Sequence, residues 1–166
     1  MPAANPDPQP LTILIADDHD LFATGLAETL APYPDLTVVG RAADGAEAVA
    51  LASVLHPDVV VMDVSMPRLD GIVATREISE TFEHMRVIVL SALTDAETAS
   101  RARSAGAVAY LFKGCPIDHL VAAIREIGAP SPVSNGRSAP VRRGAFFSSN
   151  RLELLEGLSA GPAEAH

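Results

Sequence analysis

The chain has 166 residues, 48% of them hydrophobic, and a formal net charge of −9, which suits one α/β domain plus a tail and argues against binding nucleic acid by charge alone, since such proteins need a basic face. Its single cysteine, Cys115, excludes a disulfide within the chain and fits a reducing compartment. Because the N-terminus lacks a secretory pattern and no apolar run approaches the roughly 20 residues of a membrane helix, we expect a cytoplasmic protein.

Short apolar segments alternate with amphipathic ones along most of the chain. The first ten residues hold four prolines and are expected to form a disordered N-terminal tail, 1–10. Strands are then predicted at 11–17, 36–42, 58–63, 86–92 and 108–113. Helices are predicted at 21–33, 45–56, 71–82, 94–106 and 116–128.

Local signals mark several of these helix ends. Asp44 stands where the N-cap of the second helix belongs, and Thr94 with Glu97 forms a capping-box pattern at the start of the fourth. Gly106 follows the fourth helix, where a left-handed residue is common. These signals support five separate strand–helix units.

Five strand–helix units in succession imply a parallel sheet with helices on both faces. The segments 58–63 and 86–92 are apolar without alternation, as expected of strands covered on both sides. We therefore predict a doubly wound α/β fold. In such sheets the functional site lies beyond the carboxyl ends of the strands. The polar residues there are Asp17, Asp18, Asp63, Ser91 and Lys113.

These five side chains indicate phosphoryl chemistry. Three carboxylates together would repel unless a hard cation such as Mg²⁺ (or Mn²⁺) bound them. A metal ion, the Lys113 ammonium and a hydroxyl donor together suit a transferring phosphoryl group. No glycine-rich nucleotide loop is present, so the metal and the side chains must hold that group. A carboxylate can itself be the nucleophile, and Asp63, which ends the central strand, is the best candidate.

The motifs carry a resemblance to a known family. Asp17-Asp18, "VVVMDVSMPRLDG", "VIVLSA" and "AYLFKG" occur in the order and spacing of the receiver domain of bacterial two-component response regulators. The likeness covers residues 11 to about 128, which we take as the receiver domain, and it implies a flavodoxin-like (βα)5 doubly wound fold with strand order 2-1-3-4-5. "ADDHDLF" and "RARSAGAVAYLFKG" resemble the NarL/FixJ subfamily in particular. Members of that subfamily normally carry a LuxR-type helix-turn-helix domain after the receiver.

The resemblance implies a role for each site residue. Asp63 would accept phosphate from the phosphohistidine of a partner sensor histidine kinase. Asp18, Asp63 and the backbone carbonyl of Ser65 would bind Mg²⁺ directly, with Asp17 acting nearby through a metal-bound water. Lys113 would pair with the phosphate.

The resemblance also implies a switch and an output. Ser91 would turn its hydroxyl toward the aspartyl phosphate, and Tyr110 would swing inward when Ser91 moves. Phosphorylation would favour a homodimer, through helices 1 and 5 or through helix 4, strand 5 and helix 5. The output would be control of transcription.

Other interpretations of these residues stay open. Asp17-Asp18 could be a helix N-cap cluster, Tyr110 could be ordinary packing, and His19 is expected at the rim of the pocket without a catalytic role. The chain could instead be a receiver-like interaction module that is never phosphorylated. An Asp-nucleophile phosphatase is a further rival, but it needs a second carboxylate where this chain has Ser65.

The C-terminal part differs in composition. Residues 129–150 are rich in Pro, Ser, Gly and Arg and are predicted to be a linker. Within the short tail 151–166, "LELLEGLS" resembles the first helix of a LuxR-type domain, but Pro162 falls where the second helix should run. The tail is interpreted as the start of a truncated helix-turn-helix domain or as a disordered tail with one short helix. Either way, specific DNA binding by this chain alone is not expected.

Overall fold

A computed structural model of the chain describes residues 9–129 and 147–148. Five parallel strands form the central sheet: β1 (Leu11–Ala16), β2 (Leu36–Ala42), β3 (Val59–Met62), β4 (Arg86–Ser91) and β5 (Ala109–Phe112). Their order is β2-β1-β3-β4-β5, as predicted, and the two-residue strand β6 (Phe147–Ser148) extends the sheet beside β5. The flavodoxin-like fold class is therefore confirmed.

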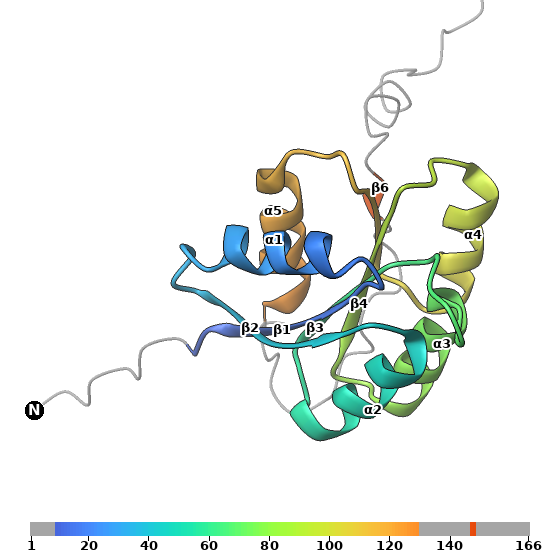
Figure 1. Cartoon of the computed structure of the whole chain (residues 1–166), viewed down its shortest axis with the longest axis horizontal. Coiled ribbons are helices and arrows are strands. Elements are labelled where there is room, and N and C mark those ends of the chain that lie inside the picture. Colours follow the sequence, from blue (N-terminus) through green and yellow to red (C-terminus); the bar gives the residue numbers. More distant parts are fainter. Residues whose placement is uncertain (1–8, 130–146, 149–166) are drawn as a thin grey trace, which may run out of the picture.

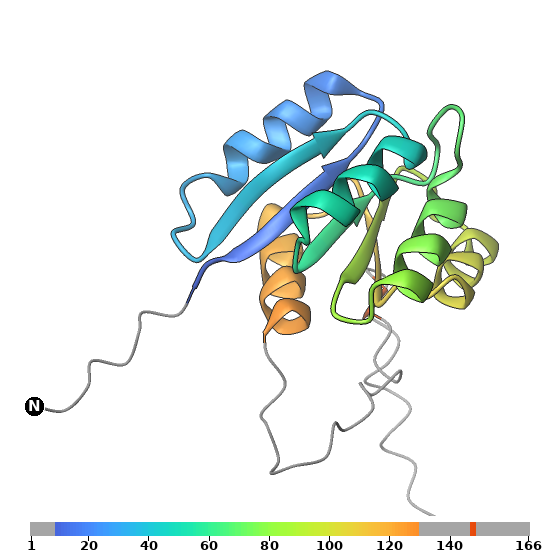
Figure 2. The same ribbon diagram turned by 90° about the horizontal axis from the view of Figure 1, so that it is seen from below.

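Helices cover both faces of this sheet. They are α1 (Asp20–Leu30), α2 (Gly45–Leu55), α3 (Gly71–Thr81), α4 (Ala96–Ser104) and α5 (Ile117–Gly128). Figures 1 and 2 show α1 and α5 on one face and α2, α3 and α4 on the other. In the described part of the chain no helix has the length and apolar character needed to cross a bilayer.

The core is aliphatic and follows from the continuous apolar strands. Val59, Val61, Ile88 and Leu90 point to the face that α1 and α5 cover, and alternate residues such as Val60 point to the opposite face. Because both faces of β3 and β4 are buried, neither of these two strands alternates apolar with polar residues. Burial on both sides fixes the register of the sheet, since a slip of one residue would exchange the two faces.

Most predicted helix bounds differ from the structure by one to three residues, with physical reasons. α1 begins at Asp20 and stops at Leu30 rather than at residue 33, because Pro32 has no backbone N–H for a further helical turn. The capping-box prediction at Thr94 is wrong. Asp95 is the N-cap of α4, and its side chain accepts a hydrogen bond from Thr98 N at 2.7 Å. Asp44 caps α2 as predicted, bonded to Glu47 N.

The predicted terminal segments lie almost wholly outside the described residues. This holds for the N-terminal tail up to residue 8, for most of the 129–150 linker and for the 151–166 tail. The exception is β6, which falls inside the predicted linker and pairs in parallel with Ala109 and Tyr110 of β5.

Candidate functional site

The strand register brings the predicted carboxylates together. Ala16 of β1 is paired with Met62 of β3, so the next residues, Asp17 and Asp63, emerge side by side at the carboxyl edge of the sheet. The Asp63 N–H donates to Ala16 O at 2.8 Å, which holds the two strand ends against each other. The two aspartates are each only 4% exposed.

Lys113, which directly follows β5, reaches the same two carboxylates. Its N–H donates to Ser91 O at 2.8 Å, so the end of β5 is held to the end of β4. Its ammonium lies 2.6 Å from Asp17 Oδ2 and 3.4 Å from Asp63 Oδ2, and it also sits over the ring of Phe22 at 4.6 Å from the centroid. This half-buried cation offsets part of the repulsion between the two carboxylates.

The electrostatic balance still leaves Asp63 short of positive charge. Burial, followed by the charge of Asp17, raises the pKa of Asp63 above its ordinary value. The Lys113 ammonium and the Ser65 N–H act in the opposite direction but do not cancel the rise. An additional cation near Asp63 would therefore favour its ionised, nucleophilic form.

A set of ligand atoms suited to such a cation is present. Oxygen atoms of Asp17, Asp18 and Asp63 and a ring nitrogen of His19 all lie within 4.8 Å of one another. The Asp18 side chain is 29% exposed, so the cluster opens to solvent on one side. Clustered carboxylates beside a solvent opening fit the oxygen ligands and retained waters that Mg²⁺ prefers.

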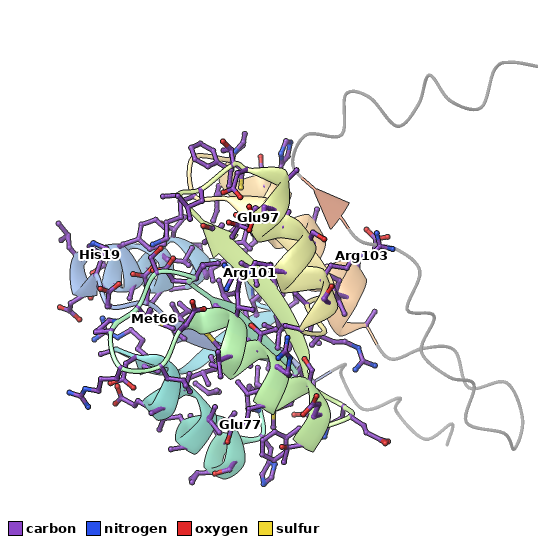
Figure 3. All side chains as sticks on the ribbon, turned by 90° about the vertical axis from the view of Figure 1, so that its right-hand side faces the viewer. His19, Met66, Glu77, Glu97, Arg101 and Arg103 are labelled. Atoms are coloured by element: carbon purple, nitrogen blue, oxygen red, sulfur yellow. The ribbon has the colours of Figure 1, made fainter. Side chains whose placement is uncertain are left out.

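The β3–α3 loop follows Asp63 directly and leads to α3. Figure 3 shows Met66 of this loop and His19 on the same side of the molecule. Gly71 N donates to Val64 O at 3.1 Å, and a Cβ at Gly71 would overlap the carbonyl oxygen of Asp63. Glycine is needed at this position because the start of α3 lies directly against the backbone of Asp63. The metal-binding role of the Ser65 carbonyl stays a prediction.

Ser91 and Tyr110 meet at one residue of the β4–α4 loop. The Ser91 hydroxyl, 1% exposed, accepts a hydrogen bond from Leu93 N at 3.0 Å. The Tyr110 hydroxyl donates to Leu93 O at 2.7 Å, and its ring is buried in a cluster with Val89 and Ala102. Burial is the main cause of the raised pKa of Tyr110. Tyr110, which was expected to swing inward when Ser91 moves, already lies inward in this structure, within a connected unit of β4, the β4–α4 loop and β5.

The five residues expected at the strand ends lie there, but two contacts of the site were not anticipated. His19, which was expected at the rim, has a side chain that is 70% exposed and a ring nitrogen 3.1 Å from Asp18 Oδ1 and 3.3 Å from Asp17 Oδ1. Phe22 under Lys113 and the backbone of Leu93 were not anticipated. Neither contact could be predicted, because residue type alone does not reveal a ring packed under an ammonium or a main-chain hydrogen bond.

Comparisons with known proteins agree with this geometry. A family model described as "Response regulator receiver domain" matches residues 13–125. The response regulator GacA of Pseudomonas aeruginosa is 39% identical over 119 residues, which is 72% of this chain and 56% of that protein. The transcriptional regulatory protein LiaR of Bacillus subtilis is 38% identical over 122 residues, covering 74% of this chain and 58% of that protein.

A solved structure gives the same result for the fold. The signal receiver domain of the response regulator NarL from Mycobacterium tuberculosis superposes with a TM-score of 0.69 at 30% identity. The match covers 73% of this chain and 98% of that domain. In contrast, the chain spans little more than half the length of the two curated relatives.

Proposed function

The chain belongs to the response regulator receiver domain family, and on that premise we propose that it accepts a phosphoryl group on Asp63 from the phosphohistidine of a sensor histidine kinase. Receiver domains are modules of two-component signalling. The observation that carries the proposal is the Lys113 ammonium, which contacts Asp17 at 2.6 Å and Asp63 at 3.4 Å while its side chain is only 15% exposed. This contact supports the proposal because the Asp63 carboxylate lies directly beside an ammonium that could pair with a phosphoryl group.

The proposed transfer uses this chain's own side chains in defined roles. A carboxylate oxygen of Asp63 attacks phosphorus, the P–N bond of the phosphohistidine breaks, and the electron pair leaves with the imidazole of the kinase. Asp18, Asp63 and the Ser65 carbonyl would hold Mg²⁺ (or Mn²⁺), with Asp17 acting through water. When bound, the ion neutralises charge on the phosphoryl oxygens. Lys113 pairs with those oxygens from the opposite side.

The same residues account for a switch. Once Asp63 carries a phosphoryl group, the Ser91 hydroxyl turns from Leu93 toward it and pulls on the β4–α4 loop, to which Tyr110 is bonded. A local gain of charge thereby biases a packed element with two arrangements. We propose that the altered surface favours a homodimer, through α1 and α5 or through α4, β5 and α5.

The output we propose is control of transcription, and the name of LiaR as a transcriptional regulatory protein supports it. DNA contact would need an output domain, and the tail in which its first helix is predicted, 151–166, lies outside the described residues. We further propose that the only catalysis by this chain is its own phosphorylation and dephosphorylation.

The test is incubation of the full chain with acetyl phosphate and Mg²⁺, followed by intact-protein mass spectrometry. We expect a gain of about 80 Da, the mass of one phosphoryl group. Asp63→Asn should gain nothing, because an amide is not a nucleophile here. Asp20→Asn is the matched control, since the Asp20 side chain is 91% exposed and outside the cluster, and it should behave like the unmodified chain.

Two other results would each contradict the proposal. If the chain never gains this mass, the interaction-module interpretation replaces it. If the chain steadily hydrolyses a phosphomonoester with dependence on Asp63, an Asp-nucleophile phosphatase replaces it. No acidic residue stands two positions after Asp63, where that reaction needs a general acid, because Ser65 occupies the position.

A further inference from the structure

His19 lies close enough to the carboxylate cluster to be a metal ligand. Its Nδ1 atom is 3.1 Å from Asp18 Oδ1 and 3.3 Å from Asp17 Oδ1. Two neighbouring ligands of an octahedral ion, each at about 2.1 Å from it, are separated by about 3 Å. The imidazole nitrogen is therefore spaced from the oxygen of Asp18, a proposed direct ligand, as a neighbouring ligand would be.

The position of His19 is set by its backbone, while its ring stays adaptable. The His19 N–H donates to Asp17 Oδ1 at 2.9 Å, which fixes the residue against the cluster. His19 is also the N-cap of α1, so its backbone is held by the start of that helix, and the N–H of Ala23 donates to His19 O. The side chain itself is 70% exposed, and it can adjust to an ion without disturbing the core.

We propose that His19 supplies a nitrogen ligand to the divalent-cation site and shifts its preference from Mg²⁺ toward transition-metal ions such as Co²⁺. The inference rests on the metal site of the proposed function. Mg²⁺ prefers oxygen ligands, whereas imidazole suits the later first-row ions. A site of carboxylates alone would therefore discriminate less in favour of Co²⁺ than this one does.

A second interpretation of the same contacts makes a different prediction. If the ring only neutralises Asp17 and Asp18 as a charged neighbour, removing it would change the affinity for Mg²⁺ and Co²⁺ by the same factor. If the ring is a ligand, removing it would weaken Co²⁺ binding and leave Mg²⁺ binding nearly unchanged. The ratio of the two affinities therefore separates the interpretations.

The test is calorimetric titration of the full chain, prepared without a polyhistidine tag, with MgCl₂ and with CoCl₂. For His19→Ala we expect the Co²⁺ affinity to fall by on the order of tenfold or more, as for loss of a metal ligand or its support. The Mg²⁺ affinity should stay within about twofold. The visible absorption of bound Co²⁺ should also change, because a nitrogen ligand is replaced by water.

A matched control removes imidazoles elsewhere. The rings of His56 and His84 lie with centroids 6.1 Å apart and could bind Co²⁺ adventitiously. The double variant His56→Ala/His84→Ala should therefore keep the Co²⁺ affinity and spectrum of the carboxylate site. A variant with Asp18→Asn should lose tight binding of both ions.

The outcomes distinguish this inference from the proposed function. Equal changes for Co²⁺ and Mg²⁺ in His19→Ala, in a chain that still binds Mg²⁺ and accepts phosphate, would overturn the nitrogen-ligand role alone. Absence of tight binding of either ion to the unmodified chain would overturn this inference together with the proposed metal site.

Discussion

At the residue scale, the site depends on the balance of charge around Asp63. Two buried carboxylates, Asp17 and Asp63, both contact the Lys113 ammonium. The contact with Asp17, at 2.6 Å, is shorter than the contact with Asp63, at 3.4 Å. Burial is the largest cause of the raised pKa of Asp63, and the charge of Asp17 adds to it. A carboxylate held in this way is costly to ionise without a metal and becomes easier to ionise once a cation binds nearby.

This imbalance predicts a pH-dependent effect of Asp63→Asn on stability in the absence of metal. Because the folded-state pKa of Asp63 lies above its unfolded value near 3.8, the fold favours the protonated acid, and wild-type stability is lost as pH rises through the folded-state pKa. Asp63→Asn removes that loss. Urea unfolding in EDTA should show the variant to be more stable than wild type at neutral pH.

The stability advantage of Asp63→Asn over wild type should shrink as the pH falls toward the unfolded-state pKa. There Asp63 of the folded wild type is protonated and, like the asparagine of the variant, carries no charge. The exposed Asp20→Asn change serves as the control, and we expect no such pH-dependent gain from it. A variant less stable than wild type at neutral pH would show that Lys113 outweighs burial and the charge of Asp17.

The sequence allowed these residues to be identified but not their distances. Asp17, Asp18, Asp63 and Lys113 were predictable because each follows an apolar strand, and parallel strands end at one edge of the sheet. The contact of His19 with two carboxylates depends on side-chain rotamers, which spacing in the sequence does not determine.

At the element scale, the apolar pattern predicted the strands and the parallel sheet, the family resemblance predicted the strand order, and short local features were less predictable. Five buried or half-buried strands joined by helices leave few possible topologies, since parallel crossovers are right-handed. The start of α4 was placed wrongly because Thr94 and Asp95 can both cap a helix, and only the extended backbone of Asp95 decides between them. The pairing of β6 was not predictable from two residues without periodicity.

The contact between β3 and α3 predicts opposite effects for two glycine substitutions. Gly71→Ala would force the start of α3 away from the Asp63 carbonyl, and overpacking of this kind costs about 1–3 kcal/mol of stability. It should also slow phosphorylation of Asp63 by acetyl phosphate, because the nucleophile is displaced.

Gly25→Ala in α1 is the matched control for Gly71→Ala. A Cβ at Gly25 would have no neighbour within 4 Å, so the change should stabilise the helix by about 0.5–1 kcal/mol. Chemical denaturation of both variants measures the difference. Equal stability of Gly71→Ala and wild type would contradict the close approach of α3 to Asp63.

At the scale of the whole molecule, a metal bound at the sheet edge should stabilise the fold. Strands β1 and β3 and the β3–α3 loop all contribute to the site, so an ion that binds only the folded form links them. The free energy of unfolding should rise by about 2.7 kcal/mol at an Mg²⁺ concentration one hundred times the dissociation constant. Thermal unfolding with and without Mg²⁺ measures this shift.

Two controls separate binding at the site from general screening of a chain with net charge −9. NaCl at matched ionic strength should give a smaller rise than MgCl₂. Asp18→Asn should lose most of the specific Mg²⁺ effect, because Asp18 is the most exposed carboxylate of the cluster and a predicted direct ligand. The same stabilisation by Mg²⁺ in Asp18→Asn would contradict a site at this edge of the sheet.

The most direct test of Asp63 as the phosphoryl acceptor is to locate the modification within the chain. After treatment with acetyl phosphate and Mg²⁺, borohydride reduces an acyl phosphate to an alcohol, which converts the modified aspartate to homoserine. Peptide mass spectrometry should then find homoserine at position 63 and aspartate at positions 17 and 18. Homoserine at another position, or none anywhere in the chain, would contradict phosphorylation of Asp63.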